Sequence, residues 1–122
     1  MTSRQRQELA RLDARVFTLA GMQARAIALA GSDAPQYPAW ASAMKVLASE
    51  IRIEIAQLAT EILGPSALVV GPGRDGTLSI ASADSAALWA YELLDATAGP
   101  IYAGTNEIQR NIIAEVGLGL PR

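Results

Sequence analysis

Two long stretches of helical periodicity, separated by a short run of helix-breaking residues, constrain this 122-residue chain more than any other feature. The first extends from about residue 4 to residue 30, and the second from about residue 38 to residue 63. Between them, residues 31–35 read Gly-Ser-Asp-Ala-Pro, with glycine and proline in the order that ends a helix. Because the connection is so short, we expect the two helices to fold back on one another as an antiparallel hairpin.

Apolar residues recur at three- and four-residue steps in both stretches, as on the buried face of a helix. In the first stretch these positions are Leu9, Leu12, Val16, Leu19, Gln23 and Ile27, where Gln23 is a polar interruption. In the second they are Met44, Leu47, Ile51, Ile55, Leu58 and Ile62. Glu50 and Glu54 are like charges one turn apart, a pattern that is typical of a solvated face.

Two shorter helices are predicted in the second half of the chain. One covers about residues 84–98, and the other opens at Gly104-Thr105 and turns Ile108, Ile112 and Val116 inward. Residues 66–83 are predicted to form a loop, with a short extended piece at 68–70, and residues 117–122 form a non-helical tail. The pattern predicts a single all-α domain over residues 1–122, an antiparallel up-and-down bundle of about four helices.

Composition excludes several kinds of chemistry. The chain has neither cysteine nor histidine, so disulfides, Cys-His nucleophile pairs and most zinc sites are absent, and we predict no metal. Its net charge of −2 argues against nucleic-acid binding. The polar N-terminus is unlike a secretory signal, and no apolar run is long enough for a membrane span. These features favour a cytoplasmic protein.

The start of the fourth predicted helix is the most informative segment for chemistry. A Gly-Thr pair at a helix start leaves backbone N–H groups free beside a hydroxyl, where the helix dipole favours an anion such as a phosphate. The alternative is an ordinary capped helix, which is the commoner meaning of such a pattern. The residues alone leave both interpretations open.

The same segment carries a family resemblance. Residues 102–115 read Tyr-Ala-Gly-Thr-Asn-Glu-Ile-Gln-Arg-Asn-Ile-Ile-Ala-Glu and are followed by Leu-Gly-Leu-Pro-Arg at 118–122. This resembles the C-terminal signature of the acyl-CoA dehydrogenases. Residues 43–50, together with Glu-Ile-Leu-Gly-Pro at 61–65, resemble the family's long helix and the turn after it. The resemblance covers most of the chain but lacks the first helix of the family's C-terminal domain and the whole of its middle β-domain.

The resemblance implies an FAD enzyme that dehydrogenates acyl-CoA thioesters between the α- and β-carbons, as in lipid or steroid side-chain degradation. It implies acyl-CoA as substrate, electron-transfer flavoprotein as electron acceptor, and homo- or hetero-oligomers of dehydrogenase subunits. On this basis the chain is a C-terminal domain or fragment that contributes a wall of the flavin and substrate site and oligomer contacts. The alternative is a non-catalytic helical interaction subunit of a dehydrogenase complex.

Site residues are carried over by position. Gly104 matches the glycine beside the substrate thioester, Thr105 matches a threonine near the FAD pyrophosphate, and Glu107 falls where many members have a flavin-adjacent glutamine. A second group falls on the family's Gln-x-x-Gly-Gly turn, which meets the FAD adenosine of a neighbouring subunit; it consists of Glu61, Gly64 and Pro65.

Ala103 occupies the position at which many members have the glutamate that abstracts the α-proton. A methyl group cannot accept a proton, so no catalytic residue is assigned in this chain. Three explanations remain open. The base can lie on another helix outside this chain, it can belong to a different subunit of a mixed complex, or the chain can be an inactive relative.

Overall fold

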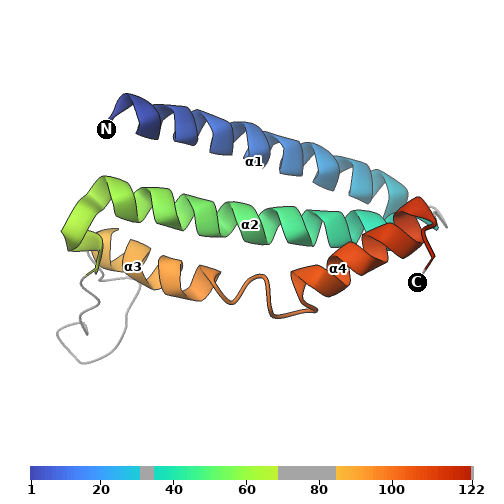
Figure 1. Cartoon of the computed structure of the whole chain (residues 1–122). Helices are drawn as coiled ribbons and strands as arrows, with labels where there is room; N and C mark the ends of the chain where they lie inside the picture. The colour runs from blue at the N-terminus through green and yellow to red at the C-terminus, as the bar shows by residue number, and fades with distance from the viewer. Residues whose placement is uncertain (31–34, 69–84, 122) are drawn as a thin grey trace.

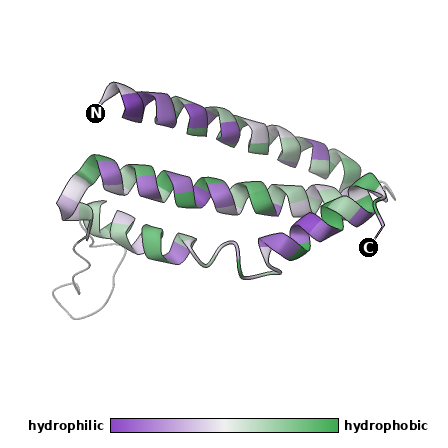
Figure 2. Cartoon of the chain, viewed as in Figure 1, coloured by the Kyte–Doolittle hydropathy of each residue, from purple (hydrophilic) through white to green (hydrophobic). Residues whose placement is uncertain are grey.

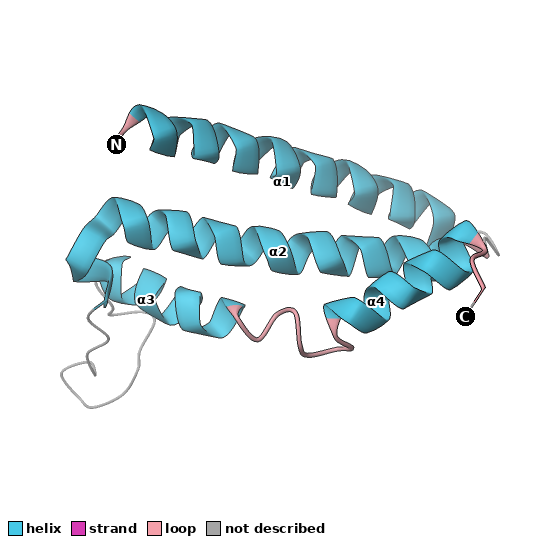
Figure 3. Cartoon of the chain, viewed as in Figure 1, coloured by secondary structure: helices cyan, strands magenta, loops and turns pink. Residues whose placement is uncertain are grey.

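The computed structural model describes residues 1–30, 35–68 and 85–121, and the regular structure in these ranges is entirely helical (Figure 3). The elements are α1 (Ser3–Ala30), α2 (Tyr37–Leu63), η1 (Gly64–Leu68), α3 (Ser85–Ala96), α4 (Asn106–Ile112) and η2 (Ile113–Gly117). η1 is a 3₁₀ turn and η2 a π-helical turn that continues α4. The predicted all-α fold with four helices is confirmed.

α2 is the central element of the fold (Figure 1). α1 runs antiparallel to it along one side, which confirms the predicted hairpin. α3 and α4 follow one another along the other side of α2, with a turn between them. Within the described residues α1 packs against α2 alone, so α2 separates α1 from the C-terminal helices.

The face of α1 that packs on α2 differs from the predicted stripe. The residues of α1 that are not exposed are Gln5, Glu8, Leu12, Arg15, Leu19, Met22, Ala26 and Leu29. Their spacing alternates between three and four residues, which is the seam of two helices packed as in a coiled coil. Of the predicted stripe, Leu9, Val16, Gln23 and Ile27 are instead exposed. The true seam admits polar residues because α2 supplies charged partners for them.

Those partners include Glu50 and Glu54, so the prediction of a solvated face there is wrong. Glu54 accepts hydrogen bonds from Arg11 and Arg15, and Glu50 accepts from Arg15 and, on α4, from Arg110. Polar side chains fill much of the N-terminal half of α1, as the hydropathy colouring also shows (Figure 2). Ion pairs therefore flank the buried Leu12 in this half of the hairpin.

The core is built mainly from small side chains. Its buried apolar residues are Leu12, Ala26, Ala39, Ile51, Ala56, Leu58, Ala67, Ala86, Ala90 and Ala96. Alanines let helix axes approach closely but bury little apolar area each. From the predicted seam of α2, Ile51 and Leu58 are buried, whereas Ile62 is 42% exposed.

The C-terminal predictions need further corrections. Ile108 and Val116 are 52% and 47% exposed rather than turned inward, and the buried residue in the first turn of α4 is Asn106. Gly117 is the last residue of η2, so the tail begins one residue later than predicted. Leu68 belongs to η1 and not to an extended piece; residues 69–83, which include the rest of the predicted loop, lie outside the described residues.

Candidate functional site

The turn between α3 and α4 holds Ala103, which the resemblance aligns with the base position, in an unusual conformation. Ala103 has a φ of 54° and Gly104 a φ of 84°, so two successive residues adopt the left-handed region. The Ala103 carbonyl accepts a hydrogen bond from Nε2 of Gln109 at 3.1 Å, and the Asn106 N–H donates to the Pro100 carbonyl at 2.8 Å. The turn is thus tied to the helix that follows it.

Gly104 is required at its position for two separate reasons. Its φ of 84° is one that L side chains rarely adopt. A Cβ added there would lie 2.7 Å from Nε2 of Gln109, the atom that holds the Ala103 carbonyl. The backbone at Gly104 is exposed, so a ligand can approach it closely from the open side.

The backbone donors at the start of α4 are already bonded within the turn. Oγ1 of Thr105 accepts from the Ile108 N–H at 3.4 Å, and the Thr105 carbonyl accepts from the Gln109 N–H at 2.9 Å. The backbone N–H of Glu107 and then the Thr105 hydroxyl stabilise the Glu107 carboxylate and lower its pKa. Of the two interpretations left open by the sequence, this geometry is that of an ordinary capped helix.

A buried polar cluster that the sequence did not predict anchors this turn to α2. Asn106 is 3% exposed; its Oδ1 accepts from Nζ of Lys45 at 2.8 Å, and its Nδ2 donates to Oγ of Ser49 at 3.0 Å. A Cβ added to Gly99 would lie 3.4 Å from Cβ of Ser49, so the chain also passes close to α2 at that point. The only signal in the sequence is that Lys45 and Ser49 lie one turn apart in an otherwise apolar part of α2.

The second predicted group lies at the C-terminal end of α2. Gly64 ends the helix with a φ of 66° and donates its N–H to the Thr60 carbonyl, and the exposed Pro65 continues into η1. Glu61 accepts hydrogen bonds from Arg4 and Gln5 on α1, and the Arg4 guanidinium is the main cause of its lowered pKa. Within this chain, Glu61 therefore links α2 to α1.

The two predicted groups do not form one site in a single chain. Asn106 packs against Ser49, which lies twelve residues before Glu61 on α2. At the rise of an α-helix, that separation is about 18 Å. Ala103, Gly104, Thr105 and Glu107 come together at one place, and Glu61, Gly64 and Pro65 at another.

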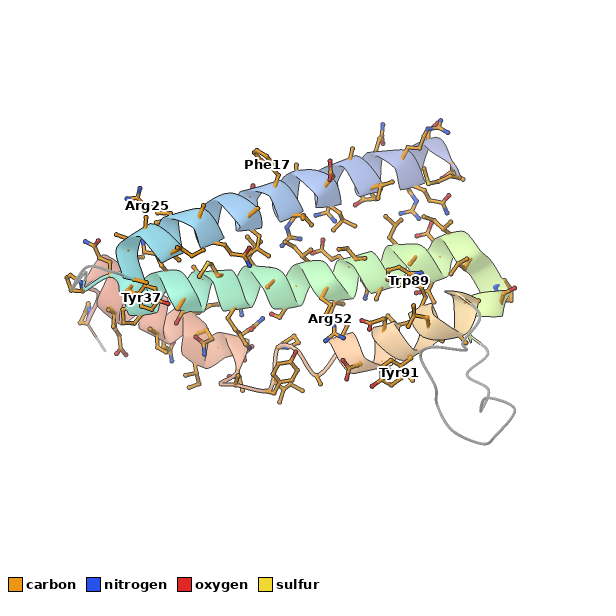
Figure 4. All side chains as sticks on the ribbon, turned by 180° about the vertical axis from the view of Figure 1, so that it is seen from behind. Phe17, Arg25, Tyr37, Arg52, Trp89 and Tyr91 are labelled. Atoms are coloured by element: carbon orange, nitrogen blue, oxygen red, sulfur yellow. The ribbon has the colours of Figure 1, made fainter. Side chains whose placement is uncertain are left out.

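A cavity of about 390 Å³ lies between α2 and α3, away from all of these residues; its lining consists of Ala48, Ile51, Arg52, Ile55, Leu88, Trp89 and Glu92. The guanidinium of Arg52 spans its edge and donates to Glu92 and Asp95 at 2.8 and 2.6 Å (Figure 4). The hydrogen bonds to Glu92 and Asp95 raise the pKa of Arg52. Since both carboxylates neutralise this one cation, the cavity offers an incoming anion little charge.

The described ranges contain no cluster of acidic side chains able to hold a metal ion. Within the same ranges, none of the helices is both long and apolar enough to span a membrane.

This all-helical architecture, a hairpin of two long helices followed by two shorter ones, fits a class of protein, the helical C-terminal domain of acyl-CoA dehydrogenases. The family model "Acyl-CoA dehydrogenase, C-terminal domain" matches residues 4–118, so the chain belongs to the acyl-CoA dehydrogenase family. The resemblance carried by residues 102–122 is thereby confirmed.

Particular relatives come from mycobacteria. The chain is 39% identical over 103 residues to the acyl-CoA dehydrogenase IpdE1 of Mycolicibacterium smegmatis and 32% identical over 104 residues to IpdE1 of Mycobacterium tuberculosis. It also resembles a chain in the crystal structure of the ChsE4-ChsE5 complex from Mycobacterium tuberculosis, with a TM-score of 0.76 and 30% identity over 99% of this chain.

These matches cover most of this chain but a small part of each relative. They span 84% and 85% of this chain, but only 23% and 24% of the two IpdE1 proteins. The chain covers 28% of the matched chain in the ChsE4-ChsE5 complex. It therefore corresponds to about a quarter of a dehydrogenase subunit.

Proposed function

We propose that this chain is the C-terminal domain of an FAD-dependent acyl-CoA dehydrogenase, where it contributes one wall of the flavin and substrate site and part of the oligomer interface. The observation that carries the proposal is the turn at Ala103 and Gly104, which presents an exposed backbone beside the last helix, in a chain that matches the family model over residues 4–118. The acyl-CoA dehydrogenase relatives support the same reaction class.

Bound FAD would accept the hydride that leaves the β-carbon of the acyl-CoA, and electron-transfer flavoprotein would then take up the electrons. The residues of this chain fit a partial role toward that cofactor. The backbone at Gly104 is exposed, although the side chain of Gln109 lies where a Cβ would be, and Thr105 and Glu107 satisfy the donors that a pyrophosphate would otherwise use. On the family resemblance, we assign Gly104 to substrate contact, and Thr105, Glu107, Glu61, Gly64 and Pro65 to the rim of cofactor sites completed by other chain segments.

The assigned acyl-CoA chemistry requires a base that this chain does not supply at Ala103. We infer that the chain alone is inactive. We also infer that it functions in the cytoplasm, in a complex with other dehydrogenase subunits. The relative in the ChsE4-ChsE5 complex, an assembly of two different proteins, supports a mixed complex.

A second candidate is a non-catalytic interaction subunit of a dehydrogenase complex. It is favoured by Ala103 at the base position and by the internally bonded donors of Thr105 and Glu107. In that case the chain retains the helical bundle and the subunit contacts without contributing to a flavin site.

The visible absorbance of the purified protein distinguishes the two. The chain is expressed alone and together with the product of the adjacent upstream gene, and each preparation is scanned for flavin bands after gel filtration. We expect no flavin in the chain alone and flavin bands in the co-purified complex, weakened by Gly104→Val but not by Gly21→Ala. If Gly104→Val leaves the flavin content of the complex unchanged, the result favours the interaction subunit. If the chain alone retains flavin, the result contradicts a partial site.

A further inference from the structure

The side chain of Gln109 holds the peptide group between Ala103 and Gly104. Nε2 of Gln109 reaches back from α4 and donates a hydrogen bond to the Ala103 carbonyl at 3.1 Å. Gln109 is partly buried, whereas Ala103 and Gly104 are both exposed. Within residues 1–30, 35–68 and 85–121, this is the one hydrogen bond made by that peptide group.

The conformation that Gln109 holds is one that alanine rarely adopts without support. Ala103 has a φ of 54°, and among the described residues it alone has a positive φ without being a glycine. Its methyl group cannot form the local hydrogen bonds by which asparagine or aspartate stabilises this region. Such a conformation persists only where the surrounding structure imposes it, so a contact from outside the residue is required.

The backbone of the turn does not supply that contact. The hydrogen bond that closes the turn runs from the Asn106 N–H to the Pro100 carbonyl at 2.8 Å, and the peptide group between Ala103 and Gly104 takes no part in it. A peptide plane can rotate through opposite changes of ψ before it and φ after it, which leave the flanking chain in place. The hydrogen bond from Gln109 opposes this rotation.

Gly104 gives the Gln109 amide access to the carbonyl. A Cβ on Gly104 would lie 2.7 Å from Nε2 and 3.9 Å from Cδ of Gln109, so the amide rests against bare backbone. In a trans peptide the N–H points away from the C=O. Because Gln109 holds the Ala103 carbonyl toward α4, the Gly104 N–H is turned to the opposite side of the turn.

We propose that Gln109 is the positioning residue of this turn, because its amide decides which way the peptide group between Ala103 and Gly104 faces. The substrate contact assigned to Gly104 depends on that direction, and this consequence rests on the proposed function. The orientation of the peptide group does not rest on it. Without the Gln109 donor, the peptide plane rotates and Ala103 moves to a negative φ.

Two substitutions remove the donor with little change in size. Gln109→Met is uncharged and keeps a similar helix propensity. Gln109→Glu also places a carboxylate oxygen, which only accepts hydrogen bonds, against the Ala103 carbonyl. Neither change should weaken α4 itself, since a carboxylate near the start of a helix is favoured by the helix dipole. Gln23→Met and Gln23→Glu are the matched controls, because Gln23 is exposed on α1.

Nuclear magnetic resonance spectra of the chain test the orientation. The cross-peak between the N–H and Hα protons of Ala103 is strong while φ is positive, because that φ brings the two protons close together. It should remain strong in the natural chain and in both controls, and it should be lost in both Gln109 variants. Unchanged signals from α1 and α2 show that a variant is folded, and Gln109→Met decides the result if Gln109→Glu does not fold. A strong Ala103 cross-peak in the folded Gln109 variants would overturn the proposal.

The co-purified complex tests the consequence for the substrate contact, with octanoyl-CoA as the probe. The measurement is the octanoyl-CoA concentration at which bleaching of the flavin bands reaches half its maximal rate. Gln109→Met should raise this concentration about threefold to tenfold, as expected for one lost hydrogen bond, and Gln23→Met should leave it unchanged. An unchanged concentration, together with loss of the Ala103 cross-peak, would overturn the link between Gln109 and the substrate contact. If the natural complex carries no flavin, the proposed function fails, while the spectra of the chain still decide the role of Gln109.

Discussion

Nδ2 of Asn106 donates a hydrogen bond to Oγ of Ser49 at 3.0 Å, and this bond joins the start of the last helix to the middle of the central one. The two residues are far apart in the sequence and both are buried. Lys45 completes the cluster through Oδ1 of the same amide. This cluster fixes the turn at Gly104 against α2, whereas Ile108 is exposed and takes no buried place there.

Replacing Asn106 by alanine should therefore destabilise the protein. The substitution removes the acceptor of the part-buried Lys45 ammonium and the amide partner of Ser49, which keeps its hydrogen bond to the Val46 carbonyl. We expect a loss of about 1–3 kcal/mol in the free energy of unfolding. Asn111→Ala is the matched control, because Asn111 is exposed on the same helix and should change stability by less than about 0.5 kcal/mol. Urea unfolding of both variants provides the measurement, and equal losses would show that the cluster does not anchor the turn.

The corrected seam of α1 predicts different costs for two leucines. Leu12 is 3% exposed and Leu9 is 49% exposed, although sequence periodicity placed them on one stripe. Leu12→Ala should cost about 2–4 kcal/mol because it leaves a cavity between α1 and α2, and Leu9→Ala should cost less than about 1 kcal/mol. Chemical denaturation at low protein concentration keeps association out of the comparison. Similar losses in the free energy of unfolding at the two positions would support the buried stripe that sequence periodicity predicts.

Replacing a glycine by alanine should have opposite effects on stability at Gly104 and at Gly21. Gly104→Ala should destabilise by about 1–3 kcal/mol, because it forces a positive φ on alanine and places a Cβ against Gln109. Gly21→Ala, in the middle of α1 with open space around its Cβ, should instead stabilise by about 0.5–1 kcal/mol. Thermal unfolding of the two variants is the measurement. A neutral Gly104→Ala would mean that the turn can relax to a negative φ.

The charge pairs between α1 and α2 predict acid sensitivity. Hydrogen bonds from Arg15 and then Arg11 lower the pKa of Glu54, and the Arg4 guanidinium lowers that of Glu61. A carboxyl whose pKa is lower in the folded state contributes stability that is present above its unfolded pKa of about 4.3. This contribution is lost as the pH falls through the lower, folded value.

Stability measured by urea unfolding should thus fall as the pH drops below about 5. Glu54→Gln should lower stability at neutral pH and flatten this decline, because its side chain no longer titrates. Added salt should reduce the difference between variant and natural protein at neutral pH, since these pairs are partly exposed. If the stabilities of the natural protein and of Glu54→Gln change with pH in the same way, Glu54 does not contribute to the acid sensitivity.

The sequence by itself determined the number, order and approximate bounds of the helices. Helical periodicity, glycine and proline at the ends, and an alanine-rich composition act locally, so 38–63 was predicted within one residue of the observed Tyr37–Leu63. The same local signals identified the turn at Gly104 and, through residues 102–122, the family.

Only the tertiary structure decided which face of each helix is buried. Apolar side chains lie on two faces of α1, one with Leu12 and Ala26 and the other with Leu9 and Ile27. The choice between these faces depends on α2, whose Glu50, Glu54 and Glu61 pair with Arg15, Arg11 and Arg4. Likewise, Asn106 takes the buried place expected for Ile108 because Lys45 and Ser49 lie opposite it. These choices depend on pairings between residues distant along the chain, and the periodicity of a single helix carries no information about them.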